Sequence, residues 1–239
     1  MLERRGLELR PPTEQADMEP EFLELHASCA SYTMTSIERM HALYEAVRHV
    51  VRTGIPGDIV ECGVWRGGSA MLAALTLNRL GDRERHLHLY DTFAGMPEPG
   101  KLDVDVLGQT AGPTWQSQQR DDINEWCYSS LAEVRENLRS TGFPNDRLHL
   151  VEGLVEETIP ANVPERIAVL RLDTDWYEST WHELQYLYPL LSPGGVLIVD
   201  DYGHWAGARA AVDRYLAELA NPPLLNRIDY TGRIGVRVE

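Results

Sequence analysis

The chain has 239 residues, 43% of them hydrophobic, which is enough for one substantial core and too few for two independent domains of ordinary size. Its formal net charge of −15 leaves no basic stripe for a phosphate backbone, so we expect neither a nucleic-acid nor a membrane partner. No run approaches the roughly 20 apolar residues that cross a bilayer, and the first residues lack the apolar core of a signal peptide, so we expect a cytoplasmic protein.

The N-terminal part of the chain divides into a polar segment and a helix. Residues 1 to about 20 are polar and contain Pro11, Pro12 and Pro20 without a sustained period, which is typical of a mobile arm or a lid. Apolar residues recur at helical spacing over 36–52, and Thr35-Ser36-Ile37-Glu38 fits a capping box at the start of that helix. We therefore expect order to begin after residue 20.

Short apolar runs beyond residue 57 predict strands. They cover residues 58–64, 87–91, 148–152, 167–173 and 195–201. Helical patterns lie between them, over 69–77, 131–138, 179–191 and 206–220. This alternation predicts a parallel sheet with helices on both faces, and residues 226–238 predict a closing β-hairpin.

One stretch does not fit the alternation. Residues 94–124 are rich in Gly, Pro, Asp and Gln and have neither the period of a strand nor that of a helix. Loops longer than roughly 15 residues inside a compact domain are usually functional lids or disordered. We interpret this one as part of the substrate-binding cover, with a plain surface insertion as the alternative.

Glycines and a carboxylate follow the first two predicted strands, where ligands of a doubly wound sheet bind. Residues 61–69 (ECGVWRGGS) place glycines where the backbone turns sharply before a helix N-terminus. Asp91 ends the second strand, the position of a carboxylate that accepts hydrogen bonds from ribose hydroxyls. Together they predict a nucleoside cofactor, either NAD or S-adenosylmethionine. Trp65 stands where the second glycine of G-x-G-x-x-G would let a pyrophosphate approach, which disfavours NAD.

Three further acids end the later strands. Asp173 ends the fourth predicted strand and the pair Asp200-Asp201 ends the fifth, so the topology should gather three carboxylates at one edge of the sheet. Oxygen ligands without accompanying Cys or His spacing suit Mg²⁺ better than Zn²⁺. The alternative is that these acids only cap the helices or turns that follow them.

Several motifs, taken in order, resemble the macrocin O-methyltransferase family. They are residues 32–40 (YTMTSIERM), 61–69 (ECGVWRGGS), 90–97 (YDTFAGMP), 172–180 (LDTDWYEST) and 200–205 (DDYGHW), and the match runs from about residue 30 to the C-terminus. The resemblance implies an α/β, Rossmann-like class I methyltransferase fold with a mostly parallel seven-stranded sheet, helices on both faces and a C-terminal antiparallel hairpin. We accordingly divide the chain into an N-terminal arm or lid (1–30) and a methyltransferase domain (31–239) with a covering insertion at about 94–125.

The resemblance also implies an activity, which is Mg²⁺-dependent transfer of a methyl group from S-adenosylmethionine to a sugar hydroxyl of a small glycosylated molecule. Members of the family methylate macrolide or aminocoumarin antibiotics, and a homo-oligomer is implied as well. The implied metal ligands are Asp173, Asp200 and Asp201. Asp173 is our first choice of general base, with Asp175 and His204 as alternatives. The expected cofactor contacts are Thr33, Met34, Thr35, Glu61, Gly63, Arg66, Gly67, Ser69, Asp91, Thr92, Phe93, Glu152, Gly153 and Asp173.

Rival functions share some of these residues. Asp173-Thr174-Asp175 is an Asp-x-Asp motif, of the kind that holds a metal under the diphosphate in a nucleotide-sugar glycosyltransferase. That alternative gives no role to the glycine loop or to Asp200-Asp201. A nicotinamide-dependent reductase would use the loop and Asp91 without needing metal-binding acids, and a non-catalytic adenosine-binding module needs no such acids either.

Overall fold

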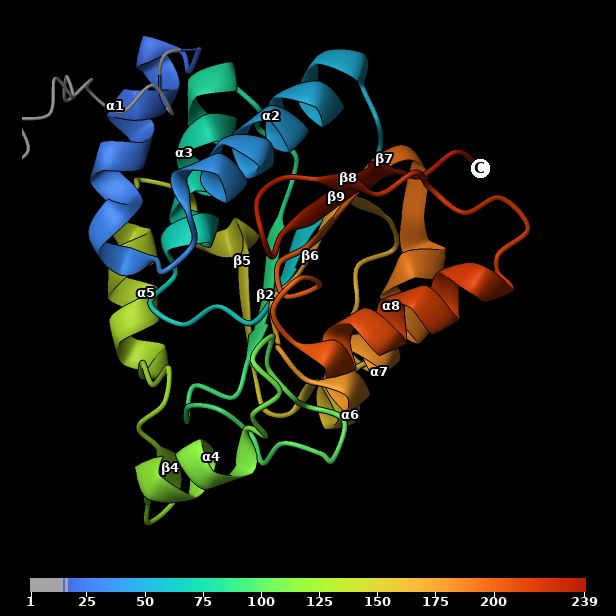
Figure 1. Cartoon of the computed structure of the whole chain (residues 1–239). Helices are drawn as coiled ribbons and strands as arrows, with labels where there is room; N and C mark the ends of the chain where they lie inside the picture. Colours follow the sequence, from blue (N-terminus) through green and yellow to red (C-terminus); the bar gives the residue numbers. More distant parts are fainter. Residues whose placement is uncertain (1–14, 16) are drawn as a thin grey trace, which may run out of the picture.

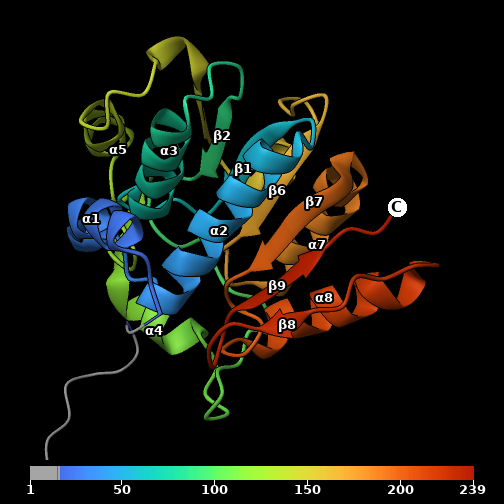
Figure 2. The same ribbon diagram turned by 90° about the horizontal axis from the view of Figure 1, so that it is seen from above.

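A seven-stranded sheet runs through the middle of the computed structural model, and helices cover both of its faces (Figures 1 and 2). The structure describes residue 15 and residues 17–239, so the predicted arm over residues 1 to about 20 lies mostly outside the described residues. The strands of the sheet are β1 Asp58–Cys62, β2 Leu87–Asp91, β5 Leu148–Glu152, β6 Ile167–Leu172, β7 Leu191–Val199, β8 Asn226–Arg227 and β9 Arg233–Val236.

The strand order is β5-β2-β1-β6-β7-β9-β8, in which β5 to β7 run parallel and β9 and β8 are antiparallel to their neighbours. The chain leaves β1 for β2 on one side and later returns to β6 on the other, so the strand order reverses at β1. The predicted mostly parallel sheet with a C-terminal antiparallel hairpin is confirmed. β7 begins at Leu191 rather than at residue 195, because Leu191 pairs with Ile167 of β6.

Each face of the sheet carries its own helical layer and its own hydrophobic core. One layer consists of α1 Pro20–Cys29, α2 Ile37–Thr53, α3 Gly68–Leu80 and α5 Leu131–Arg139, and the other of α6 Val155–Thr158, α7 Tyr177–Leu187 and α8 Ala206–Glu218 (Figure 2). Short 3₁₀ helices are η2 Ala30–Tyr32, η3 Asn145–Arg147 and η4 Tyr188–Leu190. Along β1, Ile59 faces the first layer and Val60 the second, as the two-residue period of a strand requires. Among the described residues, no helix combines the length and the apolar character that a membrane span needs.

α1 lies in the part of the chain that we assigned to the arm, and it was not predicted as a helix. Its side chains Phe22 and Cys29 are fully buried in the core that α2 and α3 form with the sheet. α1 is short and packs against both α2 and α3, so its apolar side chains do not lie on one narrow face. Its sequence therefore shows only a weak helical period of hydrophobic residues. In the structure, α1 is therefore part of the same helical layer as α2 and α3 (Figure 2).

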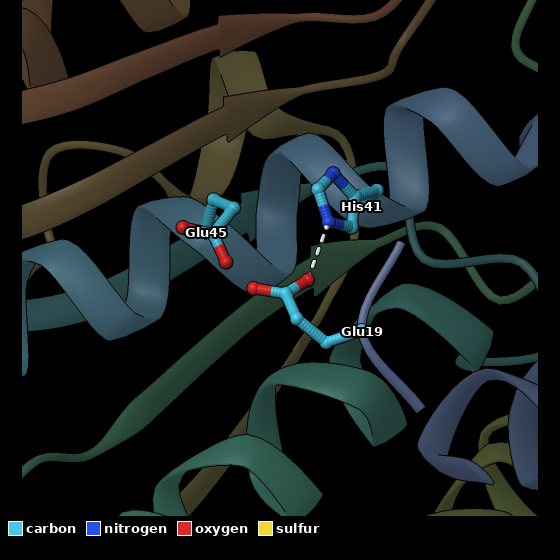
Figure 3. A group of neighbouring side chains, drawn as sticks. All are labelled: Glu19, His41 and Glu45. Carbon is cyan, nitrogen blue, oxygen red and sulfur yellow. Dashed lines mark hydrogen bonds and ion pairs between the residues drawn. The ribbon is translucent and has the colours of Figure 1, made fainter. Parts of the chain in front are cut away.

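A group of charged side chains fastens the start of α1 to α2, and we call Glu19, His41, Glu45 and Arg48 the α1 clasp. Figure 3 shows Glu19, His41 and Glu45 of this group. Glu19 lies 3.0 Å from the Nε2 atom of His41 and 2.6 Å from the Nη1 atom of Arg48. The hydrogen bond from His41, followed by that from Arg48, lowers the pKa of Glu19 to about 2. Arg48 also pairs with Glu45, so both carboxylates already have a cationic partner and the clasp is an ion-pair network rather than a metal site.

The start of α2 differs from the predicted capping box by one residue. Ser36, not Thr35, is the N-cap, and its hydroxyl accepts a hydrogen bond from the backbone N–H of Arg39 over 3.2 Å. The hydroxyl of Thr35 instead accepts a hydrogen bond of 3.0 Å from Arg171 in β6. Because the Thr35 hydroxyl is engaged by Arg171 of β6, the adjacent Ser36 hydroxyl caps α2.

The 94–125 segment contains more regular structure than the sequence predicts. It forms α4 Gly112–Gln118 and a two-stranded hairpin of β3 Gln119–Arg120 and β4 Ile123–Asn124 (Figure 1). The buried carboxylate of Asp103 accepts a hydrogen bond of 2.8 Å from the backbone N–H of Tyr177, and the carbonyl of Val104 accepts one of 2.8 Å from Ala206. The segment is therefore attached to the starts of both α7 and α8.

Candidate active site

A cavity of about 390 Å³ opens at the carboxyl ends of the parallel strands, beside the point where the strand order reverses. This is the position at which ligands of doubly wound sheets bind. Most of the sequence-predicted site residues line it, namely Thr33, Met34, Thr35, Glu61, Gly63, Ser69, Asp91, Thr92, Gly153, Asp173, Asp200, Asp201 and His204. Residues that are distant in sequence thus meet around one space.

Some predicted cofactor contacts do not line this cavity. Arg66 points away and pairs with Glu133 over 2.8 Å. Gly67 has a φ of +88° at the N-cap of α3, where it serves the turn. Phe93 is buried in the core beside α3, and Glu152 is exposed at the end of β5, next to the lining residue Gly153.

The turn after β1 is shaped by Gly63 and closed by Asp91. Gly63 has a φ of +83°, and a Cβ atom there would overlap the carbonyl oxygen of Asp173. The carboxylate of Asp91 accepts hydrogen bonds from the backbone N–H groups of Val64 at 2.7 Å and Trp65 at 3.0 Å. We predicted Asp91 as a ribose ligand; its Oδ2 atom accepts the hydrogen bonds of this turn, and its Oδ1 atom accepts one of 2.7 Å from the backbone N–H of Phe93. Burial raises the pKa of Asp91.

A buried arginine that the sequence analysis did not single out connects the two halves of the site. Arg171, near the end of β6, is 2% exposed. Its Nη1 atom lies 2.7 Å from both Glu61 and Asp173, and its Nη2 atom lies 2.6 Å from Asp200. A charged residue inside the otherwise apolar run 167–172 was the available signal, because a buried arginine requires anionic partners.

The three strand-end acids converge as predicted by the topology. Carboxylate oxygens of Asp173, Asp200 and Asp201 lie within 4.8 Å of one another. The Oδ2 atom of Asp201 is buried and has no hydrogen-bond partner among the described residues. Asp200 is fully engaged, since Arg171 binds its Oδ1 atom and Arg39 of α2 binds its Oδ2 atom. This acidic cluster therefore contains one buried carboxylate oxygen without a hydrogen bond from the described part of the chain, and two arginines bind one of its aspartates.

Asp175 joins these acids in an unusual backbone conformation. Its φ is +66°, and its Oδ1 atom accepts a hydrogen bond of 2.7 Å from the indole Nε1–H of Trp205. Burial, followed by the charge of Asp173, raises the pKa of Asp175 to about 7. Burial and the charges of Asp175 and Asp173 raise the pKa of Asp201 well above its ordinary value. Asp175 is thus a carboxyl group that can both hold and release a proton near neutral pH.

Aromatic side chains form part of the cavity wall. Trp126 and Trp205 line it, whereas Trp176 packs between them with ring centroids 5.7 and 4.9 Å away. His204 also lines the cavity and meets the ring of Trp205 edge-on at 4.9 Å. Trp115 lies outside the lining and donates its indole N–H to the carbonyl of Met96 over 2.8 Å, which supports the lining residue rather than the ligand space.

The reversal of strand order at β1, the glycine turn there and the antiparallel hairpin define a class I methyltransferase fold. Residues 17–234 match the family described as macrocin-O-methyltransferase (TylF), and the chain belongs to this family. It is an O-methyltransferase, as its relatives are.

Two curated relatives and one solved structure illustrate the similarity. The chain is 34% identical over 218 residues to an 8-demethyl-8-(2,3-dimethoxy-α-L-rhamnosyl)-tetracenomycin-C 4′-O-methyltransferase of Streptomyces olivaceus, covering 91% of this chain and 80% of the relative. It is 35% identical over 202 residues to a demethyldecarbamoylnovobiocin O-methyltransferase of Streptomyces niveus, covering 84% and 74% respectively. The structure of the O-methyltransferase NovP superposes with a TM-score of 0.76 at 35% identity, covering 87% of this chain and 83% of NovP.

Proposed function

We propose that the protein transfers the methyl group of S-adenosylmethionine to a sugar hydroxyl of a glycosylated natural product, with Mg²⁺ bound by Asp173, Asp200 and Asp201. The observation that carries the proposal is the convergence of these carboxylates at the cavity that the glycine turn after β1 also lines. The acceptor class is supported by the relatives, one of which is named for a rhamnosyl 4′-hydroxyl.

The residues of the acidic cluster fit a hard divalent cation. The Oδ2 atom of Asp201 is buried without a partner among the described residues, and every donor is a carboxylate oxygen. Burial, followed by the charges of neighbouring acids, raises the pKa of Asp175 and of Asp201, and a divalent cation would stabilise their ionised forms. When bound, such an ion supplies Lewis-acid polarisation and positioning of an acceptor oxygen.

Asp175 is the best candidate for the general base. A sugar hydroxyl must lose its proton as it attacks the methyl group, and Asp175 offers a carboxylate on the cavity lining whose hydrogen bond comes from the neutral indole of Trp205. Asp173, our first choice from the sequence, is held in an ion pair of 2.7 Å by Arg171. In this assignment, Asp175 takes the proton on its carboxylate while Trp205 fixes its orientation through the indole N–H.

The remaining lining residues divide between cofactor and acceptor. Glu61 and Ser69 lie by the glycine turn, where we expect the polar groups of the cofactor. Trp126, Trp205 and Met96 form an apolar wall that suits one face of a sugar ring and excludes water from the reacting oxygen. The glycosyltransferase alternative would leave the glycine turn and Asp201 without a role, and we do not propose it.

Calorimetry tests the cofactor assignment directly. We expect S-adenosylmethionine to bind, with or without Mg²⁺, and UDP-sugar and NADPH not to bind. Binding of a UDP-sugar in a Mg²⁺-dependent manner, without binding of S-adenosylmethionine, would instead support a glycosyltransferase. Mass spectrometry of reactions with a panel of demethylated glycosylated antibiotics then identifies the acceptor.

Substitutions in the acidic cluster test the chemical roles. We expect Asp201→Ala to abolish methyl transfer and leave the affinity for S-adenosylmethionine unchanged, and Asp175→Asn to lower kcat by about 10²–10⁴-fold. The exposed Asp146, distant in the fold on η3, provides the matched control, because Asp146→Ala should retain full activity. Normal turnover by Asp201→Ala would contradict the metal assignment.

We also retain a homo-oligomer in the cytoplasm as part of this proposal. Sedimentation of the purified protein measures the number of subunits, and cell fractionation measures the location.

A further inference from the structure

Asp200, one of the proposed metal ligands, has both carboxylate oxygens engaged by arginines. Its Oδ1 atom accepts a hydrogen bond of 2.6 Å from Arg171, and its Oδ2 atom forms an ion pair with the Nη1 atom of Arg39. Asp200 is 2% exposed, so its charge is balanced mainly by these two arginines rather than by bulk solvent. A cation that coordinates Asp200 would therefore compete with a guanidinium group for the same carboxylate oxygen.

The two arginines differ in how firmly they are held. Arg171 is 2% exposed and also binds Glu61, Asp173 and Thr35, so moving it would leave several buried groups without partners. Arg39 lies at the edge of the cavity, its side chain is 12% exposed, and only its Nη1 atom contacts Asp200.

Arg39 already has a second anionic partner outside the cluster. Its Nε atom lies 2.9 Å from the Oδ2 atom of Asp229, in the turn that joins β8 to β9. The hydroxyl of Ser36, the N-cap of α2, lies 3.4 Å from the same Nε atom and donates a hydrogen bond of 2.8 Å to Asp229. Loss of the contact with Asp200 would therefore leave the guanidinium paired with Asp229.

We propose that Arg39 is an internal counter-ion of Asp200 that withdraws toward Asp229 when a divalent cation binds the acidic cluster. This inference rests on the proposed Mg²⁺ site. A guanidinium and a divalent cation on the same carboxylate repel each other strongly in a poorly solvated site, so the more weakly held charge moves. Arg39 stabilises the cluster in the protein without a cation and, for the same reason, lowers its affinity for one.

The first test measures cation affinity and stability in Arg39→Met. By calorimetry we expect Mg²⁺ to bind about tenfold more tightly than to the wild type, because a competing positive charge has been removed. In EDTA the variant should unfold at a lower temperature than the wild type, and Mg²⁺ should raise its Tm by more. Arg209→Met is the matched control, since Arg209 lies over the ring of Tyr202 and has no ion-pair contact with the cluster.

The second test removes the alternative partner, and its wild-type arm does not depend on the Arg39→Met variant folding. Asp229→Asn keeps an Oδ1 acceptor for the backbone N–H groups of Thr231 and Gly232 but loses the charge that would receive Arg39. We expect it to weaken Mg²⁺ binding several-fold in the wild-type background and to have no effect in Arg39→Met.

The outcomes separate the inference from the function on which it rests. If the wild type shows neither heat nor a rise in Tm with Mg²⁺, the proposed metal site fails, and this inference fails with it. If the wild type binds Mg²⁺ but Arg39→Met binds it equally or less tightly, the metal site stands and the counter-ion role is wrong. If Asp229→Asn weakens Mg²⁺ binding equally in the wild type and in Arg39→Met, the lost negative charge acts on the cation directly. That result would also refute the movement of Arg39 toward Asp229.

Discussion

Glu61 of β1 and Arg171 of β6 are direct partners in the parallel register, and their side chains form an ion pair of 2.7 Å inside the sheet. Burial raises the pKa of Glu61 to about 7 despite this guanidinium, so the arginine is the charge that keeps the group partly ionised. The pair joins the glycine turn after β1 to the acids after β6 and β7. The proposed cofactor side and the proposed metal side of the cavity therefore share one buried charge.

Replacing Arg171 by Met should destabilise the protein strongly. The substitution leaves Glu61 and Asp173 without this cation and Asp200 with Arg39 as its remaining cationic partner, and breaking such a buried pair costs about 3–5 kcal/mol. Urea unfolding measures the free energy. Arg79→Met is the control, because Arg79 is 44% exposed and its pairing with Glu21 spans 3.4 Å, so it should cost less than about 1 kcal/mol. Equal costs for the two variants would show that Arg171 is not the central charge.

Gly63→Ala should cost about 3 kcal/mol, since it combines a left-handed backbone with overlap on the carbonyl of Asp173. Gly81 provides a matched control at the end of α3. It has a φ of +73° with nothing within 4 Å of an added Cβ, so Gly81→Ala should cost only about 1–2 kcal/mol. Urea unfolding of both variants measures the difference. A Gly63→Ala variant as stable as Gly81→Ala would mean that the turn can move away from Asp173.

The sequence identified the strands and their polar ends because the predicted strands are short apolar runs, of which the first is followed by glycines and the other four end in a carboxylate. Asp173 and Asp200 could be placed together from chain topology alone, since parallel strands end at one edge. Arg39 could not, because it lies 161 residues from Asp200 in the sequence and belongs to an ordinary amphipathic helix. The period of hydrophobic residues shows which face of a helix is buried. It does not show which distant acid a single polar residue of that helix, such as Arg39, will contact.

The short elements of the 94–125 segment were also missed, for a related reason. The side-chain amide of Asn124 donates a hydrogen bond of 2.8 Å to the carbonyl of Trp115, and the carbonyl of Ala94 accepts one of 2.8 Å from the N–H of Asn124. These contacts hold a seven-residue helix and a hairpin of two two-residue strands, which are too short to show a detectable hydrophobic period. Such structure is determined by tertiary contacts rather than by local sequence.

Glu183 of α7 should behave as a neutral acid. It is fully buried, accepts a hydrogen bond of 2.9 Å from Thr174, and burial raises its pKa well above the ordinary value. Glu183→Gln keeps an acceptor for Thr174 and should change stability by less than about 1 kcal/mol, whereas Glu183→Leu leaves the Thr174 hydroxyl unpaired and should cost about 1–3 kcal/mol.

The pH dependence of the same variants provides a second measurement. Because the pKa of Glu183 is raised in the folded protein, its contribution is fully present below the ordinary pKa of 4.5 and is lost as the pH rises. The free energy of unfolding, measured with urea, should therefore fall more for the wild type than for Glu183→Gln when the pH is raised from 5 to 8. A constant difference between the two proteins would mean that Glu183 is ionised in the fold.

Glu19→Gln should loosen the α1 clasp in a pH-dependent manner. The pKa of Glu19 is lowered to about 2, so its stabilising effect is present above the ordinary value of 4.5 and is lost as the pH falls toward 2. The side chain is 41% exposed, and solvent screening limits the effect at neutral pH to about 0.2–1 kcal/mol. Hydrogen exchange should become faster over residues 20–29 in this variant. Glu24→Gln is the control, since Glu24 is 69% exposed, and unchanged exchange in both variants would argue against the clasp.

Trp205 is both the residue that pairs with Asp105 of the 94–125 segment and the donor that orients Asp175. Any exchange of this segment between related enzymes, made to alter which antibiotic is accepted, therefore also acts on the carboxyl group proposed as base. Chimaeras that transplant the segment together with the loop between β7 and α8 should keep their turnover, whereas those that move the segment alone should lose it along with the old acceptor.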